Sequence, residues 1–95
     1  MNCFNGSKYL KKAIYSVILQ TYKDWELIFW DNQSIDNSAA ILKKFEDKRI
    51  KYFISDTHTS QYEARRKAVL KAEGNYIAFL DVDDSWKKNK LQSQI

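Results

Sequence analysis

The chain has 95 residues, of which 44% are hydrophobic and 29% are charged, so it holds one domain at most and is not disordered throughout. Its 16 basic and 12 acidic residues give a formal net charge of +4, too small and too dispersed to indicate a nucleic-acid-binding or membrane-binding tail. A single cysteine, Cys3, excludes an internal disulfide and a cysteine-based zinc site, and no apolar run reaches the roughly 18 residues of a membrane-spanning helix. We therefore expect a cytoplasmic domain, at most peripheral at a membrane.

The first third of the chain predicts a helix followed by a buried strand. Apolar residues recur at helical spacing over residues 8–20, and Ser7 is placed to cap the helix. The stripe consists of Leu10, Ala13, Ile14, Val17 and Ile18. Residues 26–31 contain four consecutive apolar side chains, which is typical of a strand buried on both faces in a parallel sheet.

A second helix and a second strand are predicted next. Ser34 or Asp36 can cap this helix, because both side chains accept hydrogen bonds from backbone N–H groups. The residues expected to face inward are Ile41, Leu42 and Phe45. Residues 50–54 predict a strand that is less hydrophobic than the first and therefore nearer the edge of the sheet.

The last third of the chain predicts one more helix and one more strand. The helix covers residues 61–73, and Gly74 is expected to end it in the left-handed conformation. Residues 76–80 form another continuous apolar run and predict a third strand, and a further helix is expected to begin near Trp86. Strands that alternate with helices in this order indicate an α/β fold with an open, mostly parallel sheet and helices on both faces.

An aspartate follows each predicted strand. Asp31, Asp56 and Asp81 stand at or just beyond the three carboxyl ends, which is where open parallel sheets bind ligands. Aspartate is also a common loop residue, and we interpret Asp56 in that way.

The last of these positions belongs to a cluster of acidic residues. Asp81, Asp83 and Asp84 place three carboxylates within four residues after a buried strand, and such clusters usually persist because a cation occupies the site. Mg²⁺ is typically held by one or two protein carboxylates together with substrate phosphates. The alternative is a solvated acidic turn that caps the next helix.

Arg65 is predicted to lie on the small apolar face of the helix over residues 61–73, together with Ala68, Val69 and Ala72. An arginine on that face needs an anion, and the carboxyl edge of the sheet is near. Two other interpretations stay open, namely that its guanidinium reaches solvent or that it pairs with one of the aspartates.

Several stretches of the chain, taken together, resemble the family-2 glycosyltransferases, whose nucleotide-sugar domain has the GT-A fold. The matching stretches are residues 4–10, 16–22, 25–28, 30–38, 64–65 and 74–84. They include a D-x-D pair, Asp81 and Asp83, and their order and spacing cover nearly the whole chain. No glycine-rich phosphate loop is present, which disfavours dinucleotide enzymes and P-loop nucleotidases.

The resemblance implies roles for particular residues. Asp31 corresponds to the strand-end aspartate that helps bind the nucleotide base, and the segment from Asn2 to Phe4 corresponds to the wall of the same pocket. Arg65 takes the place of the arginine next to the nucleotide.

The acidic cluster corresponds to the part of the site that binds ribose and metal. Asp81 and Asp83 would contact the ribose and a divalent cation, Mg²⁺ or Mn²⁺, and Asp84 would share in binding the metal. Asn32 stands where the family has a second acidic residue, so its contact to the base would come from an amide.

The resemblance also implies an activity and an extent. A family member transfers a sugar from a nucleotide-diphosphate donor, here expected to be a UDP-sugar, to a glycan or lipid-linked acceptor hydroxyl with inversion, in cell-surface polysaccharide biosynthesis. We expect residues 1–95 to be part of the nucleotide-sugar-binding domain, with the first strand mostly missing and the acceptor half, including the catalytic base, beyond Ile95. The isolated segment should therefore be inactive.

The sequence leaves two other functions open. Phosphatases of the haloacid-dehalogenase type also place a D-x-D pair after a hydrophobic strand, and Asp81 would then be the nucleophile and Asp83 the acid–base group. A basic nucleic-acid-binding module is the second alternative, although no recognition motif accompanies its lysines.

Overall fold

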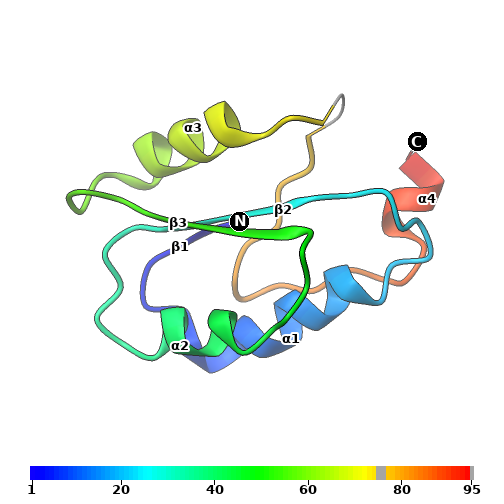
Figure 1. Ribbon diagram of the computed structural model, residues 1–95, viewed down its shortest axis with the longest axis horizontal. Helices are drawn as coiled ribbons and strands as arrows, with labels where there is room; N and C mark the ends of the chain where they lie inside the picture. Colours follow the sequence, from blue (N-terminus) through cyan, green and yellow to red (C-terminus); the bar gives the residue numbers. More distant parts are fainter. Residues whose placement is uncertain (75–76, 95) are drawn as a thin grey trace.

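The computed structural model describes residues 1–74 and 77–94 and shows an α/β fold in three layers (Figure 1). Three parallel strands form the sheet in the order β1 (Asn2–Cys3), β2 (Leu27–Asp31) and β3 (Ile50–Ile54). Helices α1 (Ser7–Ile18) and α2 (Ser38–Lys43) cover one face, and α3 (Gln61–Lys71) covers the other. A short C-terminal helix, α4 (Lys90–Gln94), lies beyond the end of α1. The predicted fold class is confirmed.

The core is organised around β2, whose five residues are all buried. Successive side chains of a strand point to opposite faces, so β2 contributes to both layers of the core. Phe29 packs against Leu10 and Ile14 of α1 and Leu42 of α2. Ile28 and Trp30 pack on the other side against Ala64 and Ala68 of α3. β3 is only half buried, as predicted for a strand at the edge.

The start of α1 differs from the prediction by one residue. Ser7 is the first helical residue and not the cap, because Gly6 takes the N-cap position. Gly6 has no side chain with which to cap the helix, and the N–H of Ser7 donates to the carboxylate of Asp36 at 3.0 Å. A residue distant in the sequence therefore satisfies the helix end, and a local pattern cannot reveal this.

The cap predicted for α2 is also wrong. The N-cap is Asn37, whose side chain makes no capping hydrogen bond, and neither Ser34 nor Asp36 takes that position. Asp36 stands one residue earlier and accepts from the backbone N–H of Ser38 at 3.0 Å. The inward side of α2 is as predicted, since Leu42 is buried and Ile41 and Phe45 pack against the same cluster.

The end of α3 does not follow the glycine prediction. The helix ends at Lys71 because Ala72 is extended, with ψ at 141°. Gly74 has no positive φ, so it does not adopt the left-handed conformation expected of it. The N–H of Glu73 instead donates to the carboxylate of Glu26.

The predicted third strand is not formed. Residues 77–80 have no strand conformation, and Tyr76 lies outside the described residues. Ile77 and Phe79 are half exposed, and Leu80 is buried against Ala13 and Val17 of α1. The edge on which this strand would pair is β1, which is only two residues long and offers a short ladder.

The C-terminal end also departs from the prediction. The last helix begins at Lys90 and not near Trp86, whose ring packs against the cluster formed with Leu80. None of the helices in the described part of the chain is long and apolar enough to cross a membrane.

Candidate functional site

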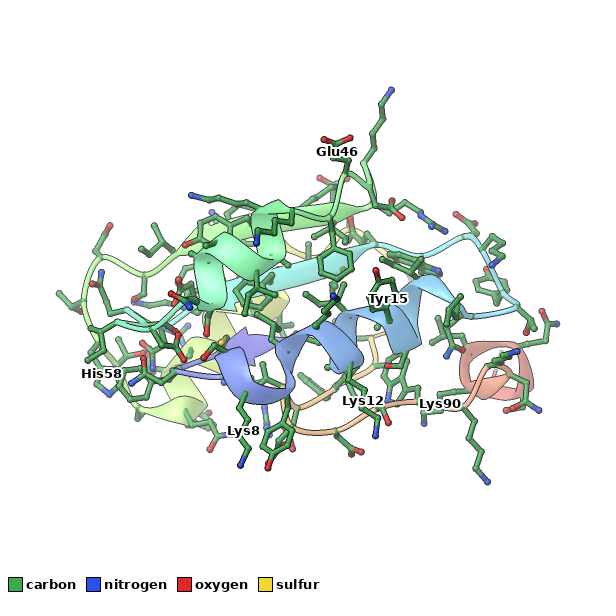
Figure 2. All side chains as sticks on the ribbon, turned by 90° about the horizontal axis from the view of Figure 1, so that it is seen from below. Lys8, Lys12, Tyr15, Glu46, His58 and Lys90 are labelled. Carbon is green, nitrogen blue, oxygen red and sulfur yellow. The ribbon has the colours of Figure 1, made fainter. Side chains whose placement is uncertain are left out.

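An open pocket of about 700 Å³ lies at the carboxyl ends of the strands. Its wall is built from β1 and the loop after it, the residue after β2 and the loop before α3. The acidic segment, residues 81–84, contributes Asp81, Val82 and Asp83. The predicted site residues in this wall are Asn2, Phe4, Asn32, Asp81 and Asp83. Lys8 and His58, which also line the pocket, lie toward one end of the molecule in Figure 2, and Lys90 lies toward the other.

The acidic segment forms a tight turn at the pocket. The N–H of Asp84 donates to the carbonyl oxygen of Asp81 at 3.0 Å, which closes a turn with Val82 and Asp83 at its centre. The side chains of Asp81 and Asp83 are exposed in the pocket wall. Asp84 is not among the residues of this wall, and its carboxylate accepts from the N–H of Ser85 at 2.8 Å.

The donor set of this turn fits a divalent cation that is shared with a phosphate ligand. Within residues 1–74 and 77–94, no three acidic, histidine or cysteine side chains converge to form a complete metal site. Mg²⁺ does not require such a cage, because it usually takes one or two carboxylates and completes its shell with water and phosphate oxygens. Asp81 and Asp83 place two exposed carboxylates in the pocket wall, a number that would fit this share of the ligands.

Arg65 meets Asp81 from the side of α3. Its guanidinium lies 3.7 Å from Oδ1 of Asp81 and 5.2 Å from the centre of the Phe79 ring. Its side chain is 44% exposed, and it lines one pocket wall together with Ala68, Val69 and Ala72, the residues predicted to share its face of α3. Ala64 and Ala68 are the buried residues of this helix. The ion pair that the sequence left open is present.

Arg65 also lines a second open pocket, of about 640 Å³, between α3 and residues 77–80. This space lies beside β1, which forms one edge of the sheet. Asp81 is not in its wall, so the Arg65–Asp81 pair stands between the two pockets.

Asp31 is almost completely buried at the end of β2. Its Oδ1 accepts from the N–H of Ser34 at 2.8 Å, and its Oδ2 accepts from the hydroxyl of Tyr52 at 2.9 Å. Burial, followed by the hydrogen bond to this carboxylate and its charge, raises the pKa of Tyr52 to about 12. In the described structure neither pocket has Asp31 in its wall, so a direct contact to a base stays a prediction.

Asn32 holds the loop that precedes α3. Its Nδ2 donates to the carbonyl of Thr59 at 2.7 Å, and its Oδ1 accepts from the N–H of the same residue at 2.9 Å. The backbone carbonyl of Asn32 lies 3.1 Å from Nδ1 of His58. An aspartate could accept here but could not donate to the Thr59 carbonyl, so the amide suits this loop.

His58 lies in the loop between β3 and α3. Although exposed, its ring lies 4.4 Å from the ring of Phe4, centre to centre, and both rings line the pocket. The two residues are 54 positions apart, and no local pattern in the sequence signals the contact. Cys3, in contrast, is buried.

The comparisons with known proteins agree with the geometry of this strand-end pocket. The model of the family described as Glycosyl transferase family 2 matches residues 1–95. The chain belongs to this family. Neither the phosphatase nor the nucleic-acid-binding alternative is favoured by any of these matches.

Curated relatives are glycosyltransferases. The chain is 38% identical over 94 residues to the "Putative teichuronic acid biosynthesis glycosyltransferase TuaG" of Bacillus subtilis, and the match covers 97% of the chain and 37% of that protein. It is 40% identical over 95 residues to the "UDP-Glc:alpha-D-GlcNAc-diphosphoundecaprenol beta-1,3-glucosyltransferase WfgD" of Escherichia coli, with 100% and 38% covered. The chain thus spans less than two fifths of the length of these relatives.

Solved structures show the same fold. The S. aureus TarS 1–349 structure in complex with UDP superposes with a TM-score of 0.92 at 26% identity, covering 98% of this chain and 29% of that one. A structure of the same protein in complex with UDP-GlcNAc superposes with a TM-score of 0.89 at 25% identity, covering 98% and 28%. These family-2 neighbours confirm the GT-A fold expected from the sequence.

Proposed function

We propose that residues 1–95 form part of the donor-nucleotide-binding domain of a glycosyltransferase that transfers a sugar from a UDP-sugar to an acceptor hydroxyl with inversion. The observation that carries the proposal is the pocket at the carboxyl ends of the strands, in which Asp81 and Asp83 share a wall with Asn2 and Phe4. The printed names of WfgD and of the TarS complexes, which include UDP-Glc, UDP and UDP-GlcNAc, support the nucleotide class.

The pocket offers different chemistry on its two sides. Phe4 and His58 present aromatic rings, and rings of this kind stack on nucleobases. Asn2 and Asn32 add polar groups on the same side, with the side chain of Asn32 already bound to Thr59. The base and ribose would therefore lie against β1 and the loop before α3.

The acidic side of the pocket would face the diphosphate. Asp81 and Asp83 would hold a divalent cation, Mg²⁺ or Mn²⁺, with Asp84 as an additional carboxylate next to them. When bound, the cation supplies positive charge that neutralises the departing diphosphate. Arg65 is held at this point by its pair with Asp81 and provides a second positive group near the phosphates.

We assign the acceptor site and the catalytic base to no residue between 1 and 95. Transfer with inversion needs a group that removes the proton of the acceptor hydroxyl, and we infer that a carboxylate elsewhere in the enzyme does so. The acceptor would be a glycan or a lipid-linked sugar, in line with the polysaccharide names of the relatives. We place the enzyme in the cytoplasm, at most peripheral at the membrane.

The proposal is tested by titrating UDP into the full-length protein with Mn²⁺ or with EDTA, by calorimetry. We expect binding that needs Mn²⁺ and that weakens by at least about tenfold in Asp83→Asn, since this carboxylate would be a ligand of the metal. Asp56→Asn is the matched control, because Asp56 is an exposed loop aspartate outside both pocket walls. UDP binding that neither EDTA nor Asp83→Asn changes would contradict the proposal.

A further inference from the structure

Three successive backbone N–H groups at the start of α1 donate to side chains of one distant segment, which comprises the loop after β2 and the first residue of α2. The N–H of Asn5 donates to Oγ of Ser34 at 2.9 Å, that of Gly6 to Oγ of Ser38 at 3.0 Å, and that of Ser7 to Oδ2 of Asp36 at 3.0 Å. We call Ser34, Asp36 and Ser38 the polar clamp. Since these N–H groups already have acceptors, they are not free to bind a phosphate. A role for the polar clamp in binding would therefore have to be indirect.

The polar clamp is itself fixed in place. The other oxygen of Asp36, Oδ1, accepts from both the N–H and the hydroxyl of Ser38, at 3.0 and 2.6 Å. Ser38 is completely buried. The bonds between Asp36 and Ser38 therefore orient both side chains that accept from the start of α1. Hydrogen-bonded networks of this kind hold a single geometry.

The loop held by the clamp also has an unusual backbone. Asn5 has a φ of 52°, in the left-handed region that costs other residues about 1 kcal/mol or more. Its Oδ1 accepts from the N–H of Ile35 at 2.8 Å, so the bonds between the two loops run in both directions. Such a conformation persists only where the surroundings determine it.

Gly6 lies against the acidic turn formed by residues 81–84. A Cβ at Gly6 would stand 2.7 Å from Cγ2 and 3.0 Å from Cβ of Val82, and 3.1 Å from Sγ of Cys3, so the two segments touch without room for a methyl group. Val82 lies between Asp81 and Asp83 and packs against the cluster that contains Cys3. A shift of Gly6 toward the turn must therefore move Val82, and the aspartates on either side move with it.

We propose that Asp36 and Ser38 are positioning residues for the carboxylates of Asp81 and Asp83, and that they act through the contact between Gly6 and Val82. This inference rests on the proposed function, because it concerns the cation and diphosphate end of the same pocket. Neither Asp36 nor Ser38 lines that pocket in the described structure, so their effect on binding would be indirect.

The first test compares Asp36→Asn with Asp47→Asn in the full-length protein. An asparagine at position 36 keeps one acceptor oxygen and cannot serve both Ser7 and Ser38. Asp47 is a matched control, because it also accepts from backbone and side chain, in this case those of Arg49, and lies before β3, in neither pocket wall. The readouts are the melting temperature and the affinity for UDP with Mn²⁺.

We expect both variants to lower the melting temperature, and Asp36→Asn to weaken UDP binding with Mn²⁺ by roughly tenfold, the usual cost of losing a group that orients a metal ligand. Asp47→Asn should stay within about twofold of the wild type, because distant sites do not couple. The melting temperature alone would not distinguish a purely structural role of Asp36 from a role in positioning the carboxylates, but the affinity for UDP does.

The second test examines the contact with Val82 and does not depend on the folding of Asp36→Asn. Gly6→Ala should weaken the same binding, and Gly6→Ala combined with Val82→Ala should recover part of it, because the closest of the crowding atoms is then removed. Ser38→Ala, which deprives the N–H of Gly6 of its acceptor, should weaken binding in the same direction.

The outcomes separate this inference from the proposed function. If the wild type does not bind UDP with Mn²⁺, the proposed function is wrong and the inference falls with it. If the wild type binds but Asp36→Asn, Ser38→Ala and Gly6→Ala bind equally well, the inference alone is overturned. Weakened binding in these variants, with unchanged binding in Asp47→Asn, supports both.

Discussion

The hydroxyl of Tyr52 on β3 donates to the carboxylate of Asp31, the last residue of β2, at 2.9 Å. The ring of Tyr52 also stacks on Phe29 of β2, with the ring centres 5.9 Å apart. The second oxygen of Asp31 binds the N–H of Ser34, one of the three clamp residues. A buried side chain in the core thus fixes the position at which the chain leaves the sheet toward the clamp.

Replacing Tyr52 by phenylalanine tests the importance of this hydrogen bond. We expect Tyr52→Phe to lower the free energy of unfolding by about 1–3 kcal/mol, because a buried carboxylate then loses one of its partners. Urea unfolding measures the change. Tyr15→Phe is the control: Tyr15 is an exposed tyrosine whose ring meets that of Phe45 edge to face, and a change at the surface should stay within about 0.5 kcal/mol. Equal losses in the two variants would contradict the role of the Asp31 bond.

Asp36 predicts a specific dependence of stability on acid. Burial acts to raise the pKa of this carboxyl group, but the hydrogen bonds from Ser38 and Ser7 outweigh it and lower the pKa to about 2 from a usual value of 3.8. A carboxyl whose pKa is lower in the folded state stabilises the protein above its unfolded pKa, and this contribution is lost as the pH falls through the folded one. The contribution of Asp36 should therefore be complete at pH 5 and mostly lost near pH 2.

Asp36→Asn isolates this contribution from that of other carboxylates. We expect the difference in unfolding free energy between the wild type and Asp36→Asn to shrink by roughly 1–2 kcal/mol between pH 5 and pH 2.5, after allowance for solvent screening. Urea unfolding at both pH values provides the comparison. A difference that stays constant over this range would show that the hydrogen bonds do not depend on the charge of Asp36.

Arg65 should matter for binding more than for stability. Its pair with Asp81 is exposed on both sides, and exposed ion pairs contribute about 0–1 kcal/mol. We expect Arg65→Ala to keep nearly all of the folding stability but to weaken UDP binding with Mn²⁺ severalfold, because a positive group near the phosphates is lost. Arg66→Ala is the matched control, since Arg66 is the next residue of α3 and forms an exposed ion pair with Glu63. Equal affinities of the two variants for UDP would show that Arg65 does not contribute to nucleotide binding.

The parts of the fold that could be predicted from the sequence are those that depend on local pattern. The buried run of β2 and the apolar stripe of α1 fix their faces by their own spacing, and both appear within one or two residues of the prediction. The run over residues 76–80 has the same composition as a buried strand, but a strand also needs an edge of adequate length, and β1 has two residues. Composition alone does not contain that information.

The site was predictable in its acidic half and less so in its supporting contacts. The sequence predicts that Asp81 and Asp83 lie at the carboxyl edge of the sheet, and both are in the wall of the pocket there. Arg65 shares a pocket wall with Ala68, Val69 and Ala72, as its helical spacing predicts, but its ion pair with Asp81 follows only from the tertiary structure. The contact between the rings of His58 and Phe4 and the hydrogen bond from Ser7 to Asp36 join segments about 30 to 50 residues apart, which only the tertiary structure brings together.

The most direct measurement is a map of where a nucleotide binds. Amide chemical shifts of the full-length protein, followed while UDP is added with Mg²⁺, distinguish the two pockets residue by residue. We predict the largest changes at Phe4, Thr59 and Asp83, which line the pocket at the carboxyl ends of the strands and not the other one. Changes centred instead on Ala68, Ala72 and Trp86, in the wall of the other pocket, or no saturable change at all, would contradict the account.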